Sequence, residues 1–239
     1  MIDRARSFDR AAEAYESARP SYPDALLDHL PLGPDAGVLD LGAGTGKLTR
    51  VLVGRYARVV AVEPLDGMRA ILERVVPDAE SLAGSAEAIP LRDASVDGVF
   101  AVTAFHWFAN DDAVAEIGRV LRPGGVFAWI WNDTIEPQPL PEPYAARFRE
   151  VEHEAGGEPR TDGELKAAMQ GGPFGELQTG TVLHEQVQDR VGVLAYASST
   201  SAVARRADAA AVLAELGDLL PEGAYRFAMR ANVTWAVRA

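Results

Sequence analysis

Residues 38–47 read Val-Leu-Asp-Leu-Gly-Ala-Gly-Thr-Gly-Lys, and this stretch decides the fold. A short apolar run ends here in a turn with glycines at positions 42, 44 and 46, and an amphipathic segment follows. Glycine lets the backbone turn sharply and approach a ligand closely, and a following helix presents free N–H groups at its start. The stretch therefore predicts a strand, a tight turn and a helix that together cradle a nucleotide.

Short apolar runs alternate with helix-length amphipathic segments from Val38 onward. We expect strands at 37–41, 58–62, 81–83, 97–102 and 126–131, and helices at 47–55, 68–75 and 112–121. Such alternation is typical of a parallel sheet with helices on both faces. The predicted fold class is therefore doubly wound α/β.

The flanking regions have patterns of their own. An Ala-rich stretch over 8–30 is interrupted by Arg-Pro-Ser-Tyr-Pro at 19–23, which predicts two short helices broken by an extended turn. Four prolines between 135 and 143 indicate an excursion from the sheet. Beyond them we expect helices at 144–155 and 163–169 and an antiparallel strand pair at 179–187 and 225–238.

We expect a single domain built in three parts. Residues 1–35 would form an N-terminal helical cap, 36–132 the ligand-binding core, and 133–239 a substrate-side insertion with the last antiparallel strands. At 239 residues the chain is long enough for one elaborated α/β domain.

Composition limits the classes of partner. The formal net charge is −12 and the one adjacent basic pair is Arg205-Arg206, so nucleic acid is not an expected partner. The apolar run at 126–131 is far shorter than a bilayer span, and the first ten residues lack the continuous apolar stretch of a signal peptide. The chain has no Cys, which fits a reducing compartment. We expect a cytoplasmic monomer or homodimer that acts on a small molecule.

Two acidic residues narrow the choice of nucleotide. Glu63 ends the second predicted strand, where its carboxylate can accept hydrogen bonds from both ribose hydroxyls, and Asp40 places a carboxylate beneath the glycine turn. A dinucleotide fingerprint needs glycine at position 47, where Lys47 stands, and no Gly-Lys-Ser/Thr triplet of a P-loop is present. NAD(P) is disfavoured, and a nicotinamide-dependent oxidoreductase remains the alternative.

Four motifs in this order resemble class I S-adenosylmethionine (SAM)-dependent methyltransferases of the type 11 kind. They are VLDLGAGTG from 38, VVAVEP from 59, GSAEAIPLRDASVDGVF from 84 and LRPGG from 121, and the resemblance covers residues 36–131. It implies a seven-stranded, mostly parallel sheet with strand order 3-2-1-4-5-7-6. It also implies SAM as cofactor and S-adenosylhomocysteine as product.

The resemblance also assigns roles to the cofactor-side residues. In the family the glycine turn holds the methionine part of SAM, the acid that matches Glu63 holds the ribose, and the segment that matches residues 85–87 frames the adenine. Ser85 stands where the family often has Asp, so the usual contact to the adenine amino group is altered here. The residues expected to contact the cofactor are Asp40, Gly42, Ala43, Gly44, Gly46, Glu63, Pro64, Met68, Ser85, Ala86, Glu87 and Thr103.

Two further segments are similar to the trans-aconitate type of small-molecule methyltransferase. They are Phe105-His-Trp-Phe108 and Ala18-Arg-Pro-Ser-Tyr-Pro23, and the similarity implies O-methylation of an organic acid or a related metabolite. His106 follows the fourth predicted strand and has the chemistry of a catalytic base near neutral pH, although an aromatic pocket wall is the alternative. The residues expected at the acceptor or in a lid are Tyr15, Arg19, Tyr22, Phe105, His106 and Trp107.

Other motifs are interpreted as serving the fold and not a functional site. Arg19 and the two lid tyrosines would equally pack on the sheet edge. We interpret Asn110-Asp111-Asp112 as a helix cap and Arg122-Pro-Gly-Gly125 as the turn into strand five, and we expect no metal. A SAM-binding protein without catalytic activity is the remaining alternative.

Overall fold

The computed structural model describes residues 12–155 and 161–239. Backbone contacts divide the chain into two compact units. Unit 1 comprises Met1–Pro20, Thr134–Glu158 and Leu183–Met229, and unit 2 comprises Ser21–Asp133, Pro159–Val182 and Arg230–Ala239.

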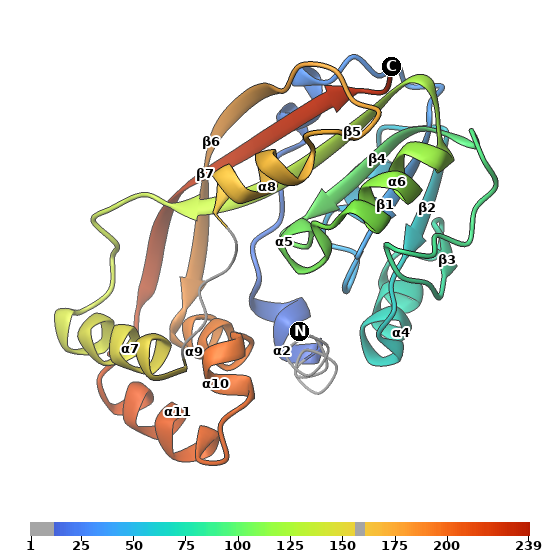
Figure 1. Ribbon diagram of the computed structural model, residues 1–239. Helices are drawn as coiled ribbons and strands as arrows, with labels where there is room; N and C mark the ends of the chain where they lie inside the picture. The colour runs from blue at the N-terminus through green and yellow to red at the C-terminus, as the bar shows by residue number, and fades with distance from the viewer. Residues whose placement is uncertain (1–11, 156–160) are drawn as a thin grey trace. The chain divides into compact units, whose positions relative to one another are not determined.

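The elements follow one another as shown in Figure 1. In chain order they are α2 (Ala12–Ala18), η1 (Asp24–His29), β1 (Gly37–Leu41), α3 (Thr49–Val53), β2 (Arg58–Val62), α4 (Asp66–Val75), β3 (Glu80–Leu82), β4 (Val96–Val102), α5 (Phe105–Phe108), α6 (Asp111–Val120), β5 (Leu121–Thr134), α7 (Glu142–Ala155), α8 (Asp162–Ala168), β6 (Gln178–Asp189), α9 (Arg190–Ser198), α10 (Ser201–Ala204), α11 (Ala209–Asp218) and β7 (Ala224–Val237).

The strands form one seven-stranded sheet in the order β3-β2-β1-β4-β5-β7-β6, as predicted. The first five pair in parallel, for example with Val38 beside Val59 and Gly98. The N–H of Gly124 donates to the carbonyl of Arg238, and the N–H of Ile135 donates to the carbonyl of Ala228. Residues further along β5 thus pair with residues earlier in β7, so the two strands are antiparallel (Figure 1). The predicted antiparallel pair at 179–187 and 225–238 is thus present as β6 and β7.

Helices cover both faces of the sheet within unit 2. On one face Phe105, Ile117 and Leu165 from α5, α6 and α8 are buried in a common core. On the other face Leu27 of η1 and Leu52 of α3 are buried. Strands β1 and β2 are buried along four of their five residues, because helices cover both of their sides. This arrangement is the predicted doubly wound α/β class.

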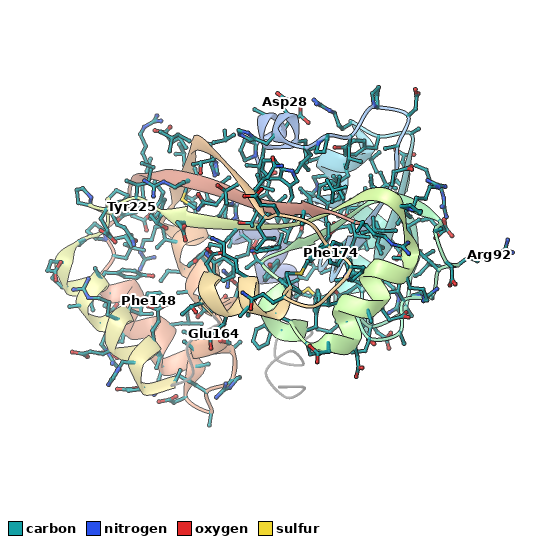
Figure 2. The ribbon with its side chains drawn as sticks, turned by 45° about the horizontal axis from the view of Figure 1, so that its top comes forward. Asp28, Arg92, Phe148, Glu164, Phe174 and Tyr225 are labelled. Atoms are coloured by element: carbon teal, nitrogen blue, oxygen red, sulfur yellow. The ribbon has the colours of Figure 1, made fainter. Side chains whose placement is uncertain are left out.

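Unit 1 has a core of its own, made largely by helices. Buried residues of α7, α9, α10 and α11 pack with the first half of β7. Tyr225 of β7 belongs to this core and Phe148 of α7 packs against it; both are labelled in Figure 2. The Ala-rich sequence of α9 to α11 gave no clear single apolar stripe, and these three helices were not predicted.

The start of β5 corrects one sequence prediction. Residues 122–125 were expected to turn into a strand at 126, but β5 begins at Leu121 opposite Val96 and carries an irregularity before Val126 pairs with Gly98. The backbone of 124 and 125 pairs with Arg238 at the end of β7. The local Pro-Gly-Gly pattern predicts a turn, but hydrogen bonds to a residue distant in the sequence keep this segment in the sheet.

The other boundaries lie close to the expected ones. Helix α3 is shorter than the predicted 47–55, and the two short N-terminal helices around 19–23 are present as α2 and η1. Residues 8–11 of the predicted first helix lie outside the described residues. The short helix α5 was not predicted, and Asn110 caps α6 as predicted, since its Oδ1 accepts from the N–H of Ala113 at 2.9 Å.

Gly46 and Gly44 both have left-handed backbone, but their surroundings differ. A Cβ on Gly46, where φ is +88°, would lie 2.6 Å from Leu72 of α4 and 2.9 Å from Val76, the residue that follows α4. A Cβ on Gly44, where φ is +58°, would meet no heavy atom within 4 Å. Gly46 therefore serves helix packing, whereas Gly44 leaves open space.

We expect Gly46→Ala to lower the free energy of unfolding by about 3 kcal/mol, through backbone strain and overpacking combined. Gly44→Ala is the matched control and should cost about 1 kcal/mol, because it adds strain alone. Urea unfolding of both variants measures the difference. Equal losses would show that α4 does not restrict position 46.

Candidate cofactor and acceptor sites

The glycine turn is fixed by the end of the neighbouring strand. The N–H groups of Gly42 and Ala43 donate to the carbonyl of Val62 at 2.8 and 3.2 Å. Gly42 has φ of +70°, and a Cβ there would lie 3.0 Å from Ala104 at the start of α5. The turn is thus held from below, while Gly44 faces open space.

Glu63 joins this turn to the segment after β2. It is buried, and its Oε2 accepts from the N–H of Gly44 at 2.8 Å while its Oε1 accepts from the N–H of Leu65 at 2.9 Å. Two backbone donors fix the orientation of the carboxylate. An ionised carboxylate has about four acceptor positions, so a carboxylate held by two backbone donors is of a kind that can also accept ligand hydroxyls.

Asp40 lies beneath the turn on the side of α3. Its Oδ2 accepts from Oγ1 of Thr49 at 2.7 Å, and its Oδ1 is buried with no hydrogen-bond partner among the described residues. Burial raises the pKa of Asp40 to about 7, and the nearby charge of Glu63 adds to this rise, whereas the bond from Thr49 opposes it. Sequence reasoning missed Thr49; its place three residues after the last glycine of the turn, at the start of α3, was the available signal.

The expected adenine segment follows β3. Ser85 bridges to Ala88, Ala86 is buried in the core, and Glu87 is exposed. Oε1 of Glu87 accepts from Nδ2 of Asn110 at 3.1 Å, which ties the segment to the cap of α6. Of the other expected cofactor residues, Ala43 and Met68 are buried and Pro64 is exposed.

The end of β4 brings several expected acceptor residues together within unit 2. Thr103 has a left-handed φ of +48°, and its Oγ1 lies 2.8 Å from the hydroxyl of Tyr22. Such backbone strain in a non-glycine residue often accompanies functional sites. His106 is 9% exposed, and its ring lies 4.6 Å from that of Trp107 and 5.3 Å from that of Trp131. Phe105 points into the core.

Tyr15 and Arg19 belong to unit 1, whereas Tyr22 belongs to unit 2. The Arg19 guanidinium lies 5.2 Å from the ring centre of Tyr15 and 4.6 Å from that of Tyr196. Its Nε donates to Oγ of Ser199 at 3.0 Å, and Nη2 donates to the Ser199 carbonyl at 3.2 Å. These contacts make Arg19 an ordered cation within unit 1.

A groove that sequence reasoning missed lies in unit 2, on β5, β6 and β7 beside α8. It has a volume of about 480 Å³. Its lining includes Trp129, Trp131, Asp133, Asp162, Thr181 and Asn232. The available signal was the position of Trp131 and Asp133 near the carboxyl end of β5, where doubly wound sheets bind ligands.

Comparisons with known proteins agree with this geometry. The methyltransferase domain family matches residues 39–129. An uncharacterized methyltransferase of Mycobacterium tuberculosis (strain ATCC 25618 / H37Rv) is 48% identical over 134 residues, which cover 56% of this chain and 55% of that protein. A malonyl acyl-carrier protein O-methyltransferase of Methylococcus capsulatus is 43% identical over 102 residues, covering 40% of this chain and 37% of that protein. The chain thus spans about half the length, or less, of these relatives.

A solved structure from Anaeromyxobacter dehalogenans, described as a candidate type II methyltransferase, is similar over nearly the whole chain. It has a TM-score of 0.68 and 29% identity, and the match covers 92% of this chain and 97% of that one. Fold and glycine turn define a nucleotide-binding α/β domain of the methyltransferase kind. Residues 39–129 thus match a methyltransferase domain and the whole chain shares the methyltransferase fold, so the chain is similar to class I methyltransferases, whose cofactor is SAM.

Two searches of the described residues concern other partners. Within 12–155 and 161–239, no group of three or more His, Asp and Glu side chains is arranged to hold a metal ion. Over the same ranges, no helix combines the length and apolarity needed to cross a membrane.

The raised pKa of Asp40 predicts a pH-dependent stability. The unfolded chain ionises Asp40 above its ordinary pKa of 3.8, whereas the folded chain retains the proton until about pH 7, so Asp40 lowers stability as the pH rises through this window. The free energy of unfolding of Asp40→Asn should therefore rise, relative to that of wild type, by on the order of 3 kcal/mol between about pH 5 and pH 8. Urea unfolding at several pH values measures this gain.

Asp97→Asn provides a control of opposite sign. Burial alone would raise the pKa of Asp97, but hydrogen bonds from Arg122 and from the N–H of Gly37 lower it. Asp97 is thus ionised in both states across this pH window, and its variant should show a constant difference from wild type. A constant difference for Asp40→Asn as well would contradict the buried, protonated carboxyl.

Proposed function

We propose that this protein transfers the methyl group of SAM to a small-molecule acceptor. The observation that carries the proposal is the open side of Gly44 next to a buried, oriented carboxylate at Glu63. A ligand backbone can approach Gly44 without meeting a side chain, and Glu63 stands where ribose hydroxyls need acceptors. The described residues therefore fit the cofactor of the class.

Each part of the turn has a role in this proposal. Residues 42–46 hold the amino-acid part of the cofactor, Glu63 binds the ribose hydroxyls, and residues 85–87 border the base. Asp40 supports the turn through Thr49, and its buried Oδ1 is an acceptor for an N–H donor of the bound ligand. Bound SAM supplies a methyl group on a positively charged sulfur, which is already activated for transfer.

The protein's remaining task is to orient the acceptor and, where needed, to take its proton. An ionised carboxylate acceptor needs no base, whereas a hydroxyl or amine does, and His106 is the proposed base for that case. The similarity to trans-aconitate-type enzymes supports an organic acid, and the named activity of the Methylococcus relative is also an O-methylation. The absence of Cys supports a reducing, cytoplasmic setting.

Glu63→Gln should weaken SAM binding by about 1.5–3 kcal/mol, the scale of a hydrogen bond to a charged group. Titration calorimetry measures the affinity, and urea unfolding of the same variant separates this effect from a change in loop stability. Glu73→Gln is the matched control, because Glu73 is an exposed residue of α4 whose carboxylate lies 3.8 Å from Nε of Arg69. Unchanged SAM affinity in Glu63→Gln would refute the ribose assignment.

Transfer itself is tested with radiolabelled SAM and a panel of carboxylic acids, phenols and amines. We expect label in at least one small acceptor, and loss of that transfer in Glu63→Gln at subsaturating SAM. Binding of SAM without transfer to any member of the panel would favour the alternative of a SAM-binding protein without catalytic activity. Binding of NADH but not SAM would favour the oxidoreductase.

A further inference from the structure

The groove beside α8 is walled by aromatic rings and carboxylates. The indoles of Trp129 and Trp131 come from β5, and Asp133 follows them two residues later on the same strand. Leu165 of α8 closes one side; it is buried and stands next to Glu164, which Figure 2 labels. No Lys, Arg or His is present among the described lining residues.

Asp133 is held in place by a chain of hydrogen bonds across three neighbouring strands. Nδ2 of Asn232 on β7 donates to Oδ2 of Asp133 at 2.8 Å. Oγ1 of Thr181 on β6 donates to Oδ1 of Asn232 at 3.0 Å. Asp133 is exposed, but this chain of hydrogen bonds fixes Asn232 and thereby orients the Asp133 carboxylate in the groove.

The charge of the groove comes mainly from Asp133. The second acid, Asp162, pairs with Lys166 at 2.6 Å, which offsets its charge. Asp133 accepts from a neutral amide, so its negative charge is not neutralised by that partner. Indole rings beside a carboxylate that has no cationic partner among the described residues form the chemical complement of a cation, and quaternary and protonated amines bind to such settings.

We propose that this groove binds a positively charged ammonium group of the methyl acceptor. The inference rests on the proposed function and narrows its acceptor class to molecules that carry such a group. The ammonium group is a recognition element, and the methylated atom is a separate part of the molecule, so an amino acid or a related zwitterion satisfies both this inference and an O-methylated carboxylate. Trp131 connects the groove to α5, because its ring contacts that of His106. Helix α5 in turn follows Ala104, which lies close to Gly42 of the glycine turn.

Three probes of one shape test the charge preference. They are choline, its neutral isostere 3,3-dimethylbutanol, and the anion 3,3-dimethylbutanoate, each titrated into the whole chain while the indole N–H signals are followed by NMR. We expect choline to shift the signal of Trp131 and to bind at least about tenfold tighter than the neutral isostere, with the anion weakest.

Two variants test whether Asp133 and Trp131 cause the preference for choline. Asp133→Asn should reduce choline affinity about fivefold to tenfold and leave that of the neutral isostere unchanged, because the shape is kept while the charge is lost. Trp131→Leu should remove most of the preference for choline while retaining an apolar wall. Asp78→Asn is the control, since Asp78 is an exposed acid next to β3 at the opposite edge of the sheet.

Equal binding of all three probes, tighter binding of the anion, or unchanged choline affinity in Asp133→Asn would overturn the inference. The probes are titrated without cofactor, and SAM affinity is measured separately on the same preparation. SAM binding without a choline preference overturns the groove assignment alone. A choline preference without SAM binding overturns the proposed function and leaves a cation-binding groove.

Discussion

The hydrogen bond between the Glu63 carboxylate and the N–H of Gly44 is the contact on which the cofactor site depends. It joins the end of β2 to the turn after β1, and the second oxygen of Glu63 holds the N–H of Leu65 at the entry to α4. The two strands are parallel neighbours, so both ends reach the same edge of the sheet. The turn and the Glu63 carboxylate, the proposed ribose acceptor, thus form one preorganised unit.

Each glycine in the turn answers a different physical demand. A Cβ at position 42 would meet Ala104 tightly, one at position 46 would clash with Leu72 and Val76, and position 44 has open space. The first and third glycines therefore allow neighbouring elements to approach closely, whereas the middle one leaves open space beside the turn. Asp40 below them is unfavourable to ionise because it is buried. The fold therefore loses stability at neutral pH by placing this carboxyl under the turn.

Local sequence patterns predicted the parts that local physics dictates. The apolar runs of β1 and β2, the glycine turn and the Asn110 cap depend on residues within a few positions of one another. The start of β5 was misjudged because Arg238, at the far end of the chain, holds it in the sheet. The groove escaped prediction because Asp133, Asn232 and Thr181 come from three strands that no local pattern connects. The roles of the predicted site residues stay predictions.

The most direct test of the central claim is calorimetric titration of the wild-type chain with S-adenosylhomocysteine and with NADH. The account predicts micromolar binding of S-adenosylhomocysteine and none of NADH, because Glu63 and the open turn fit a nucleoside with a short amino-acid chain. Binding of NADH without S-adenosylhomocysteine would contradict it.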